Sequence, residues 1–171
     1  MIIWLPPDAA VVLIGPSGAG KSTFAARHFA TTEVLSSDQM RAMVADDPND
    51  QQATEAAFEL LHTAMTLRLA RRRLTVIDAT NVEGWARQPL LAIARRQRRP
   101  AVGIVFALAL ETCLQRNLLR ENPRPPASIR RQHRWMVDTM PTLDADGFAA
   151  TWVLRTPEEV DAARVERTAV P

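Results

Sequence analysis

Cysteines and long apolar stretches are scarce in this sequence, and both shortages narrow what the protein can be. Cys113 is the single cysteine among 171 residues, so an internal disulfide is excluded. No apolar run approaches the roughly 18 residues of a membrane-spanning helix, and the apolar start at residues 1–5 is too short for a signal peptide. We therefore expect a cytoplasmic protein without a membrane partner, in which Cys113 is a core residue rather than a nucleophile.

Lysine is almost absent as well. The chain has 20 arginines and one lysine, Lys21, and its net charge is only +2. Arginine at every other basic position is typical of a GC-rich genome, and a small net charge is weak support for a nucleic-acid partner. The three histidines have no metal-ligand spacing. The single lysine therefore stands out, because it occurs where a compact ammonium on a flexible stem is chemically needed.

Residues 11–24 contain that position, and they carry the complete G-x-x-x-x-G-K-S pattern of a phosphate-binding loop. The glycines allow backbone N–H groups to curve around a phosphate, and the following helix adds a partial positive charge there. Lys21 would reach the β- and γ-phosphates, and the Ser22 hydroxyl would ligate Mg²⁺. The sequence therefore predicts binding of ATP or another NTP with Mg²⁺. The predicted contacts are Gly15, Ser17, Gly18, Ala19, Gly20, Lys21, Ser22 and Thr23.

Strand and helix patterns alternate along the whole chain. Apolar runs predict strands over 9–14, 33–36, 74–77, 101–108 and 151–154. Helical spacing and capping signals predict helices over 22–30, 39–45, 54–73, 85–96, 111–121 and 128–140, and a last helix that opens at Thr156-Pro157. This order predicts one α/β domain over 1–171, a P-loop NTPase with a mostly parallel sheet and helices on both faces. Its ligand site should lie at the carboxyl ends of the strands.

Two carboxylates follow the second and third of these strands. Asp38 fits a general base beside an acceptor hydroxyl, with Arg41 three residues later to hold an anionic group, or else it caps the short helix. Asp78 closes its strand as a Walker-B acid does, so it would hold Mg²⁺ through water or pair with Arg41. The neighbouring Thr80 and Asn81 would either cap the next helix or touch substrate.

Arginines are dense between residues 116 and 134: this segment contains six arginines and one acidic residue, Glu121. Arg116 and Arg120 have i, i+4 spacing and would project from one helix face. Prolines at 123, 125 and 126 break the segment, which favours an adenylate-kinase-like lid over about 116–140 that closes on the triphosphate. The alternative is a basic, solvated helix pair. The triplet at 71–73 is similarly either a solvated helix end or a nucleic-acid patch.

Several motifs together resemble the kinase module of bacterial polynucleotide kinase-phosphatase, an RNA-repair enzyme. They are GPSGAGKSTFA from residue 15, SSDQMR at 36–41, DDPNDQQAT at 46–54, DATN at 78–81 and the arginine-bearing lid. The similarity runs from about residue 9 to about 162. The phosphate loop alone is common to many enzymes, whereas SSD-x-x-R followed by DATN at this distance is far more discriminating.

The resemblance implies transfer of a γ-phosphate to the 5′-OH of RNA or DNA. It implies that Lys21 and Ser22 bind the donor phosphates and Mg²⁺, and that Asp38 is the base. Arg41 would hold the acceptor phosphate, positioned by Asp78, and Arg116 with Arg120 would clamp the donor. Gln51 and Thr80 would be weaker acceptor contacts.

The chain lacks metallophosphoesterase motifs and a ligase lysine. Phosphatase and ligase modules would therefore lie elsewhere in a parent polypeptide or complex, with this chain either an excised module or a stand-alone kinase. Two other functions stay open: a kinase of the same fold for a small metabolite, and a nucleotide sensor without transferase activity.

Overall fold

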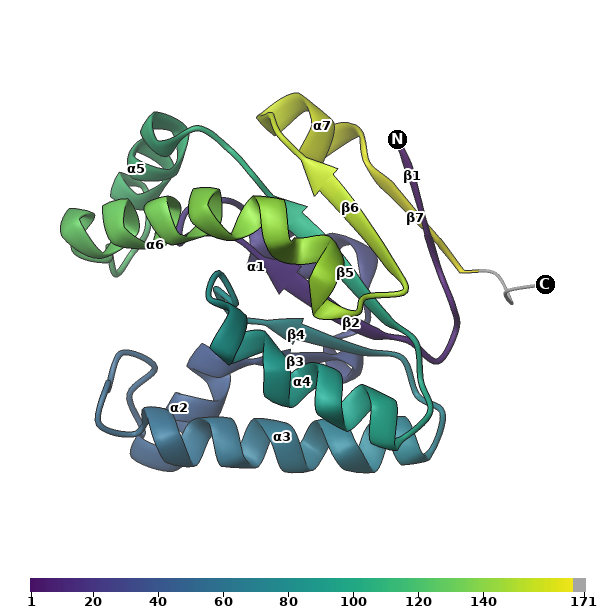
Figure 1. Ribbon diagram of the computed structural model, residues 1–171. Helices are drawn as coiled ribbons and strands as arrows, with labels where there is room; N and C mark the ends of the chain where they lie inside the picture. Colours follow the sequence, from purple (N-terminus) through teal and green to yellow (C-terminus); the bar gives the residue numbers. More distant parts are fainter. Residues whose placement is uncertain (168–171) are drawn as a thin grey trace.

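A computed structural model describes residues 1–167 of the chain as a twisted parallel sheet between two layers of helices (Figure 1). The sheet has five strands in the order β3-β4-β2-β5-β6, and every neighbouring pair is parallel. Its strands are β2 (Ala10–Ile14), β3 (Val34–Ser36), β4 (Thr75–Asp78), β5 (Ala101–Phe106) and β6 (Ala150–Leu154). This confirms the α/β fold expected from the alternating pattern.

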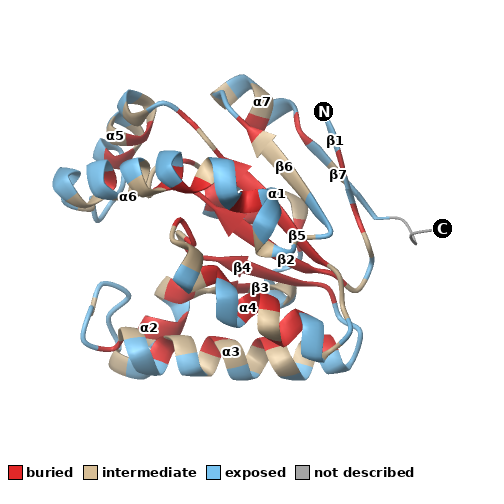
Figure 2. Ribbon diagram, in the orientation of Figure 1, coloured by how far each residue is buried: buried red, intermediate tan, exposed pale blue. Residues whose placement is uncertain are grey.

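Each of the central strands is buried on both faces, as all-parallel sheets require (Figure 2). Along β2 the side chains alternate between two cores. Val11 and Leu13 join the core with Phe24 of helix α1 (Lys21–His28), whereas Val12 and Ile14 join the core with Leu61 of helix α3 (Thr54–Ala70). Strand β2 pairs with both β4 and β5, so the loop that follows it opens at the middle of the carboxyl edge.

The helices fall within a few residues of the expected ranges. They are α1 (Lys21–His28), α2 (Ser37–Ala45), α3 (Thr54–Ala70), α4 (Gly84–Arg96), α5 (Leu110–Leu118), α6 (Pro126–Thr139) and α7 (Pro157–Ala162). The described chain also has two short 3₁₀ turns, η1 (Thr31–Glu33) and η2 (Met140–Asp146). None of the helices in residues 1–167 is both long and apolar enough to cross a bilayer.

One of the errors at the helix ends changes a prediction about the site. Helix α5 ends at Leu118, with Leu119 as its C-cap, whereas the expected helix extended to residue 121. Arg120 therefore lies beyond the helix and does not share a helical face with Arg116. The break occurs because the side chain of Asn117 turns back to bond the backbone of Arg124, which folds the proline segment against the end of α5.

A second, two-stranded parallel sheet joins the two ends of the described chain, and neither of its strands was expected. Strand β1 (Ile2–Leu5) pairs with β7 (Arg164–Arg167). Ile3 and Leu5 point into the core beside Phe24 and Val160, while Ile2 and Trp4 face outward. Because its partner strand is about 160 residues away in the sequence, the pairing has no local signal.

Candidate active site

A cleft of about 1890 Å³ opens at the carboxyl edge of the five-stranded sheet. It brings together residues that lie far apart in the sequence: the phosphate loop, the start of α2, the loop after β4, and the segment of α5, α6 and the residues between them. This last segment contains the predicted lid over about 116–140, and it is called the lid below. All predicted contact residues line this cleft except Gly15 and Ala19. Ala19 is a fully buried residue of the phosphate loop, so its side chain can support the loop but cannot touch a ligand.

The phosphate loop holds its lysine inward. Lys21 is the first residue of α1, and its Nζ donates hydrogen bonds to the carbonyl oxygens of Gly15 and Pro16, both at 2.8 Å. An ammonium has three donors, so one is free for another acceptor. Gly18 has φ +82° and Gly20 has φ +95°, a backbone conformation that favours glycine. These conformations turn the loop over the end of the central strand.

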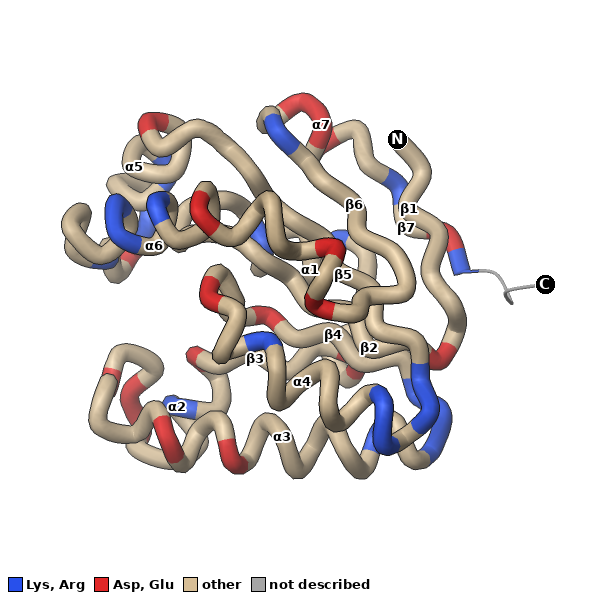
Figure 3. The backbone as a smooth tube through the Cα atoms, viewed as in Figure 1, with Lys and Arg blue, Asp and Glu red and all other residues tan. Residues whose placement is uncertain are grey.

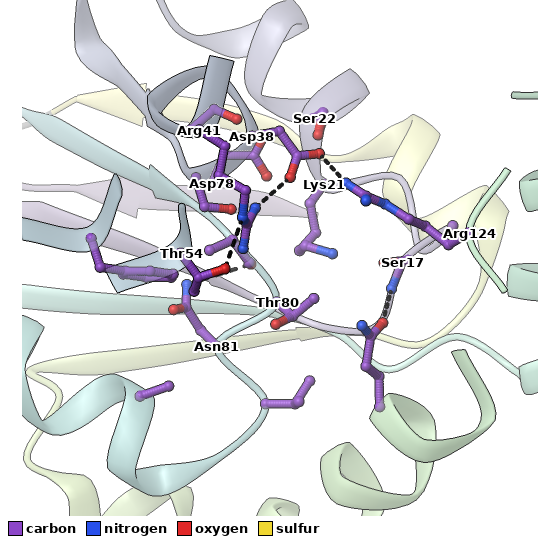
Figure 4. Close-up of a pocket in the computed structure, with 18 of the residues that line it drawn as sticks. Ser17, Lys21, Ser22, Asp38, Arg41, Thr54, Asp78, Thr80, Asn81 and Arg124 are labelled. Atoms are coloured by element: carbon purple, nitrogen blue, oxygen red, sulfur yellow. Dashed lines mark hydrogen bonds and ion pairs between the residues drawn. The ribbon is translucent and has the colours of Figure 1, made fainter. Parts of the chain in front are cut away.

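Asp78, at the end of β4, and Lys21 line the same cleft (Figure 4). Burial raises the pKa of the Asp78 carboxyl, and the Lys21 ammonium and a hydrogen bond from Ser22 act in the opposite direction. Burial likewise lowers the pKa of Lys21, and Asp78 opposes that shift. The two groups therefore stabilise each other's charged form in a region where either alone would tend to become neutral.

The carboxylate of Asp38 is held from two sides by arginines (Figure 4). Its Oδ1 accepts a hydrogen bond from Arg41 and its Oδ2 accepts one from Arg124, each at 2.9 Å. Arg41 is additionally fixed by a bond from its Nε to the hydroxyl of Thr54 at 3.2 Å. One negative and two positive charges meet here in a partly buried cluster, so the cluster has a net charge of +1.

Three expectations about these residues need correction. Asp38 does not cap α2, because Ser36 is the N-cap and its hydroxyl accepts the N–H of Gln39. Arg41 is not positioned by Asp78, since its side chain bonds Asp38 and Thr54 instead.

The third correction concerns the loop after β4. Neither Thr80 nor Asn81 caps α4, whose N-cap is Glu83. The side chain of Asn81 donates instead to the carbonyl oxygens of Leu13 and Ala79, which ties this loop to β2. Thr80 lines the cleft, and so does Gln51 on the exposed loop after α2.

The lid contacts the phosphate loop directly. A Cβ on Gly18 would overlap the carbonyl of Cys113 in α5, and a Cβ on Gly20 would lie 3.1 Å from the guanidinium of Arg116. From α6, Gln132 accepts the backbone N–H of Ser17 at 2.9 Å. Cys113 itself is fully buried, and burial raises the pKa of its thiol, as expected of a core residue.

Gln132 and Arg124 were not recognised from the sequence. Arg124 stood within the arginine-rich segment, but nothing local distinguished it from its neighbours. Its contact with Asp38 joins residues 86 apart, and the contact of Gln132 with Ser17 joins residues 115 apart. The proline break before α6 was the single available signal that this segment has a defined path.

A family model described as an AAA domain matches residues 11–142, from the phosphate loop through the lid. The chain belongs to this AAA-domain family. No curated protein matches its sequence.

Solved structures with the same fold as this AAA-domain chain include several kinases. A chain in the structure of the Pnkp1/Rnl/Hen1 RNA repair complex is 22% identical with a TM-score of 0.69, and the match covers 83% of this chain and 47% of that chain. The AAA-domain chain thus spans about half the length of that relative.

Two shorter proteins match along most of their length. A gluconokinase from Sinorhizobium meliloti 1021 is 16% identical, with a TM-score of 0.56 and coverage of 92% of this chain and 87% of that chain. The APS kinase CysC of Mycobacterium tuberculosis, in complex with AMPPNP and APS, is 18% identical, with a TM-score of 0.53. The match covers 80% of this chain and 99% of that chain. These likenesses establish the fold.

Proposed function

We propose that this protein transfers the γ-phosphate of an NTP to the 5′-OH end of a nucleic acid, RNA or DNA, as a step of end repair. The observation that carries the proposal is the Asp38 carboxylate, held by Arg41 and Arg124 in the same cleft as the phosphate loop. Asp38 would act as the base toward a hydroxyl of the acceptor. The cluster of Asp38 and the two arginines has a net charge of +1, which matches the single negative charge of a phosphodiester next to that hydroxyl.

In the reaction, Asp38 accepts the proton of the 5′-OH as its oxygen forms a bond to the γ-phosphorus. The bond between that phosphorus and the β–γ bridging oxygen breaks, and the NDP leaves with the bond's electron pair. Lys21 neutralises charge on the β- and γ-phosphates, and Arg116, whose guanidinium lies over Gly20, stabilises charge on the transferring group. Arg120 is a weaker candidate for the same task because it lies outside α5.

Mg²⁺ fits this donor set. The Ser22 hydroxyl and the Asp78 carboxylate are oxygen donors of the kind that Mg²⁺ prefers, and Asp78 would act directly or through water. Within residues 1–167 no three His, Cys, Asp or Glu side chains gather as a metal site. A site with so few protein ligands suits Mg²⁺ that is bound mainly by the phosphates of the nucleotide and by several waters. Such an ion would neutralise part of the negative charge of those phosphates.

The shape of the cleft favours a long acceptor. Its volume of about 1890 Å³ includes the donor site at the phosphate loop, and its lining continues past Asp38 along α3 and α4, beyond the place of the reacting hydroxyl. The RNA-repair structure among the relatives is consistent with this reading, and phosphatase and ligase modules would then act beside this chain in a longer polypeptide or a complex.

A small anionic metabolite is the second candidate. The triad of Asp38, Arg41 and Arg124 would also bind a carboxylate, and the gluconokinase shares the fold over 92% of this chain. In that case the acceptor would be a sugar acid or a related hydroxy acid, and Asp38 would still be the base.

The test is transfer of labelled γ-phosphate from ATP to a short 5′-OH RNA, the matching DNA, gluconate and shikimate. We expect label on the 5′ end of the oligonucleotides only. Asp38→Ala and Asp38→Asn should lower kcat by at least about 100-fold while nucleotide affinity is retained. Asp144→Ala, which removes an exposed carboxylate outside the cleft, is the matched control.

Label on gluconate or shikimate but on neither oligonucleotide would transfer the assignment to a metabolite kinase. Full activity of both Asp38 variants would remove Asp38 as the base. Nucleotide binding with no transfer to any acceptor would favour a sensor.

A further inference from the structure

The ends of α3 and α4 that lie farthest from the phosphate loop carry an unusual concentration of positive charge (Figure 3). Six exposed arginines gather there, and we call them the arginine surface: Arg71, Arg72, Arg73, Arg95, Arg96 and Arg98. The first three arginines lie at the end of α3 and the other three at the end of α4. These two helices pack against each other, so the two groups lie on one surface although they are separate in the sequence. Since the whole chain has a net charge of +2, the rest of the molecule is net negative.

The helix dipole explains only part of this cluster. Cations in the last turn of a helix are stabilised by the exposed carbonyls, which accounts for Arg95 and Arg96. Arg72 and Arg98, however, lie beyond the ends of α3 and α4, with φ of 55° and 54°. Helices commonly place glycine at this left-handed position, and a residue with a Cβ is disfavoured there by about 1 kcal/mol or more. Both helices thus carry a cation at a conformational cost.

The arginine surface is available for an external anion. None of its six guanidinium groups forms an ion pair with a residue of the described chain. Its neighbour Arg99 is different, because it is paired with Asp8. Six guanidinium groups without such pairs repel one another, and a polyanion would relieve that repulsion.

The cleft connects this surface to the candidate active site. Beyond Asp38 the lining continues between α3 and α4, passes Trp85 and Leu67, and reaches Arg96. Trp85 is 72% exposed at the start of α4, where its ring is open to stack on a base. From Trp85 to Arg96 the helix rises about 17 Å, which is the length of about five stacked nucleotides.

We propose that the arginine surface binds backbone phosphates in the downstream part of a single-stranded 5′-OH nucleic acid whose end is at Asp38. The strand follows the groove between α3 and α4, with Trp85 stacked on one of its bases. This inference rests on the proposed function and adds to it a minimum acceptor length. A stacked strand needs about five nucleotides to run from Trp85 to Arg96, in addition to those between Asp38 and Trp85.

The experiment compares 5′-OH acceptors of 3 and 12 nucleotides. One variant replaces the α3 group (Arg71→Gln, Arg72→Asn, Arg73→Gln) and another the α4 group (Arg95→Gln, Arg96→Gln, Arg98→Asn), with asparagine chosen where φ is positive. For the 12-mer we expect KM to rise about three- to thirtyfold with little change in kcat. The slope of log(kcat/KM) against log[salt] should become shallower by about 0.7 for each phosphate that the variant no longer neutralises. For the 3-mer neither parameter should change.

Two controls isolate the effect of position from that of charge. The variant Arg155→Gln, Arg164→Gln, Arg167→Gln removes the same charge from exposed sites outside the cleft and the lid, and it should leave the 12-mer KM unchanged. Lysine at the six positions keeps the charge and should keep most of the 12-mer affinity.

Equal effects on both acceptors, or no effect on either, would overturn the inference and leave the proposed function intact. A wild-type protein that transfers phosphate to neither acceptor would overturn both.

Discussion

At position 18 the phosphate loop depends on the absence of a side chain. Gly18 has φ +82°, and a Cβ there would overlap the carbonyl of Cys113 in α5. Gly18→Ala should therefore destabilise the fold by roughly 1–2 kcal/mol for the backbone conformation alone, and by more if α5 moves away. Because displacement of α5 also moves Arg116, we expect ATP affinity to fall as well. Urea unfolding and titration with a fluorescent nucleotide measure the two effects.

Gly84→Ala is the matched control for that substitution. Gly84 begins α4, its φ is not positive, and a Cβ would come no closer than 3.8 Å to another side chain. Stability and ATP affinity should both stay near wild type. If Gly18→Ala behaves like Gly84→Ala, the close approach of α5 to the phosphate loop is not required for binding.

Some residues of the candidate site can be recognised from the sequence around them, whereas others depend on contacts with distant parts of the chain. Lys21 and Ser22 belong to a continuous motif, and Asp38 and Asp78 follow strand ends, which parallel topology brings to one edge. Their positions could therefore be predicted from the sequence, while their roles stay predictions. Arg124 and Gln132 could not be identified, because their contacts with Asp38 and Ser17 depend on how the lid folds back across the sheet.

At the scale of elements, the five-stranded sheet was predictable because each strand is a short apolar run between turn signals. The expected ranges 9–14 and 101–108 overlap β2 and β5 fully, with small errors at their ends. The pair of β1 and β7 was not predictable. Strand β7 has the sequence RVER, in which one residue is apolar, and its pairing with β1 depends on the whole domain having folded.

The lid helix α6 makes a contact whose strength can be tested. Gln132 accepts the N–H of Ser17, in the loop expected to surround the donor phosphates. Gln132→Glu places a negative charge there, and a like charge about 5 Å away costs about 3 kcal/mol at an effective dielectric constant near 20. We expect ATP affinity to fall by about 100-fold. Gln132→Ala removes the side-chain oxygen that would compete with a phosphate for the N–H of Ser17. The ATP affinity of this variant should therefore be unchanged or slightly higher.

Gln88→Glu controls for the charge itself, since Gln88 is exposed on α4 and outside the cleft. Calorimetric titration with ATP and ADP at two salt concentrations gives the comparison. Equal affinities for the glutamate variants at 132 and 88 would mean that Gln132 lies away from the phosphates when nucleotide binds.

At the scale of the whole molecule, one fully buried arginine joins several elements of the fold. Arg87 of α4 bonds Asp146 of η2 at 2.6 Å, Thr139 of α6 at 2.7 Å, and the carbonyl oxygens of Asn81 and Val82. Its guanidinium thus joins the base of the lid, the helix layer of α4 and the loop beside Asp78. Every partner is a hydrogen-bond acceptor, so the buried charge is compensated from several elements at once.

Arg87→Leu should therefore destabilise the protein globally. It leaves the Asp146 carboxylate, 11% exposed, and several carbonyl oxygens without a donor, and loss of one partner of a buried pair typically costs about 3–5 kcal/mol. Arg27→Ala breaks an exposed pair with Asp161 and should cost less than about 1 kcal/mol. The urea midpoint should fall much further for Arg87→Leu, with an unchanged m-value if unfolding stays two-state. Similar midpoints for both variants would mean that the lid and the sheet are joined by apolar packing alone.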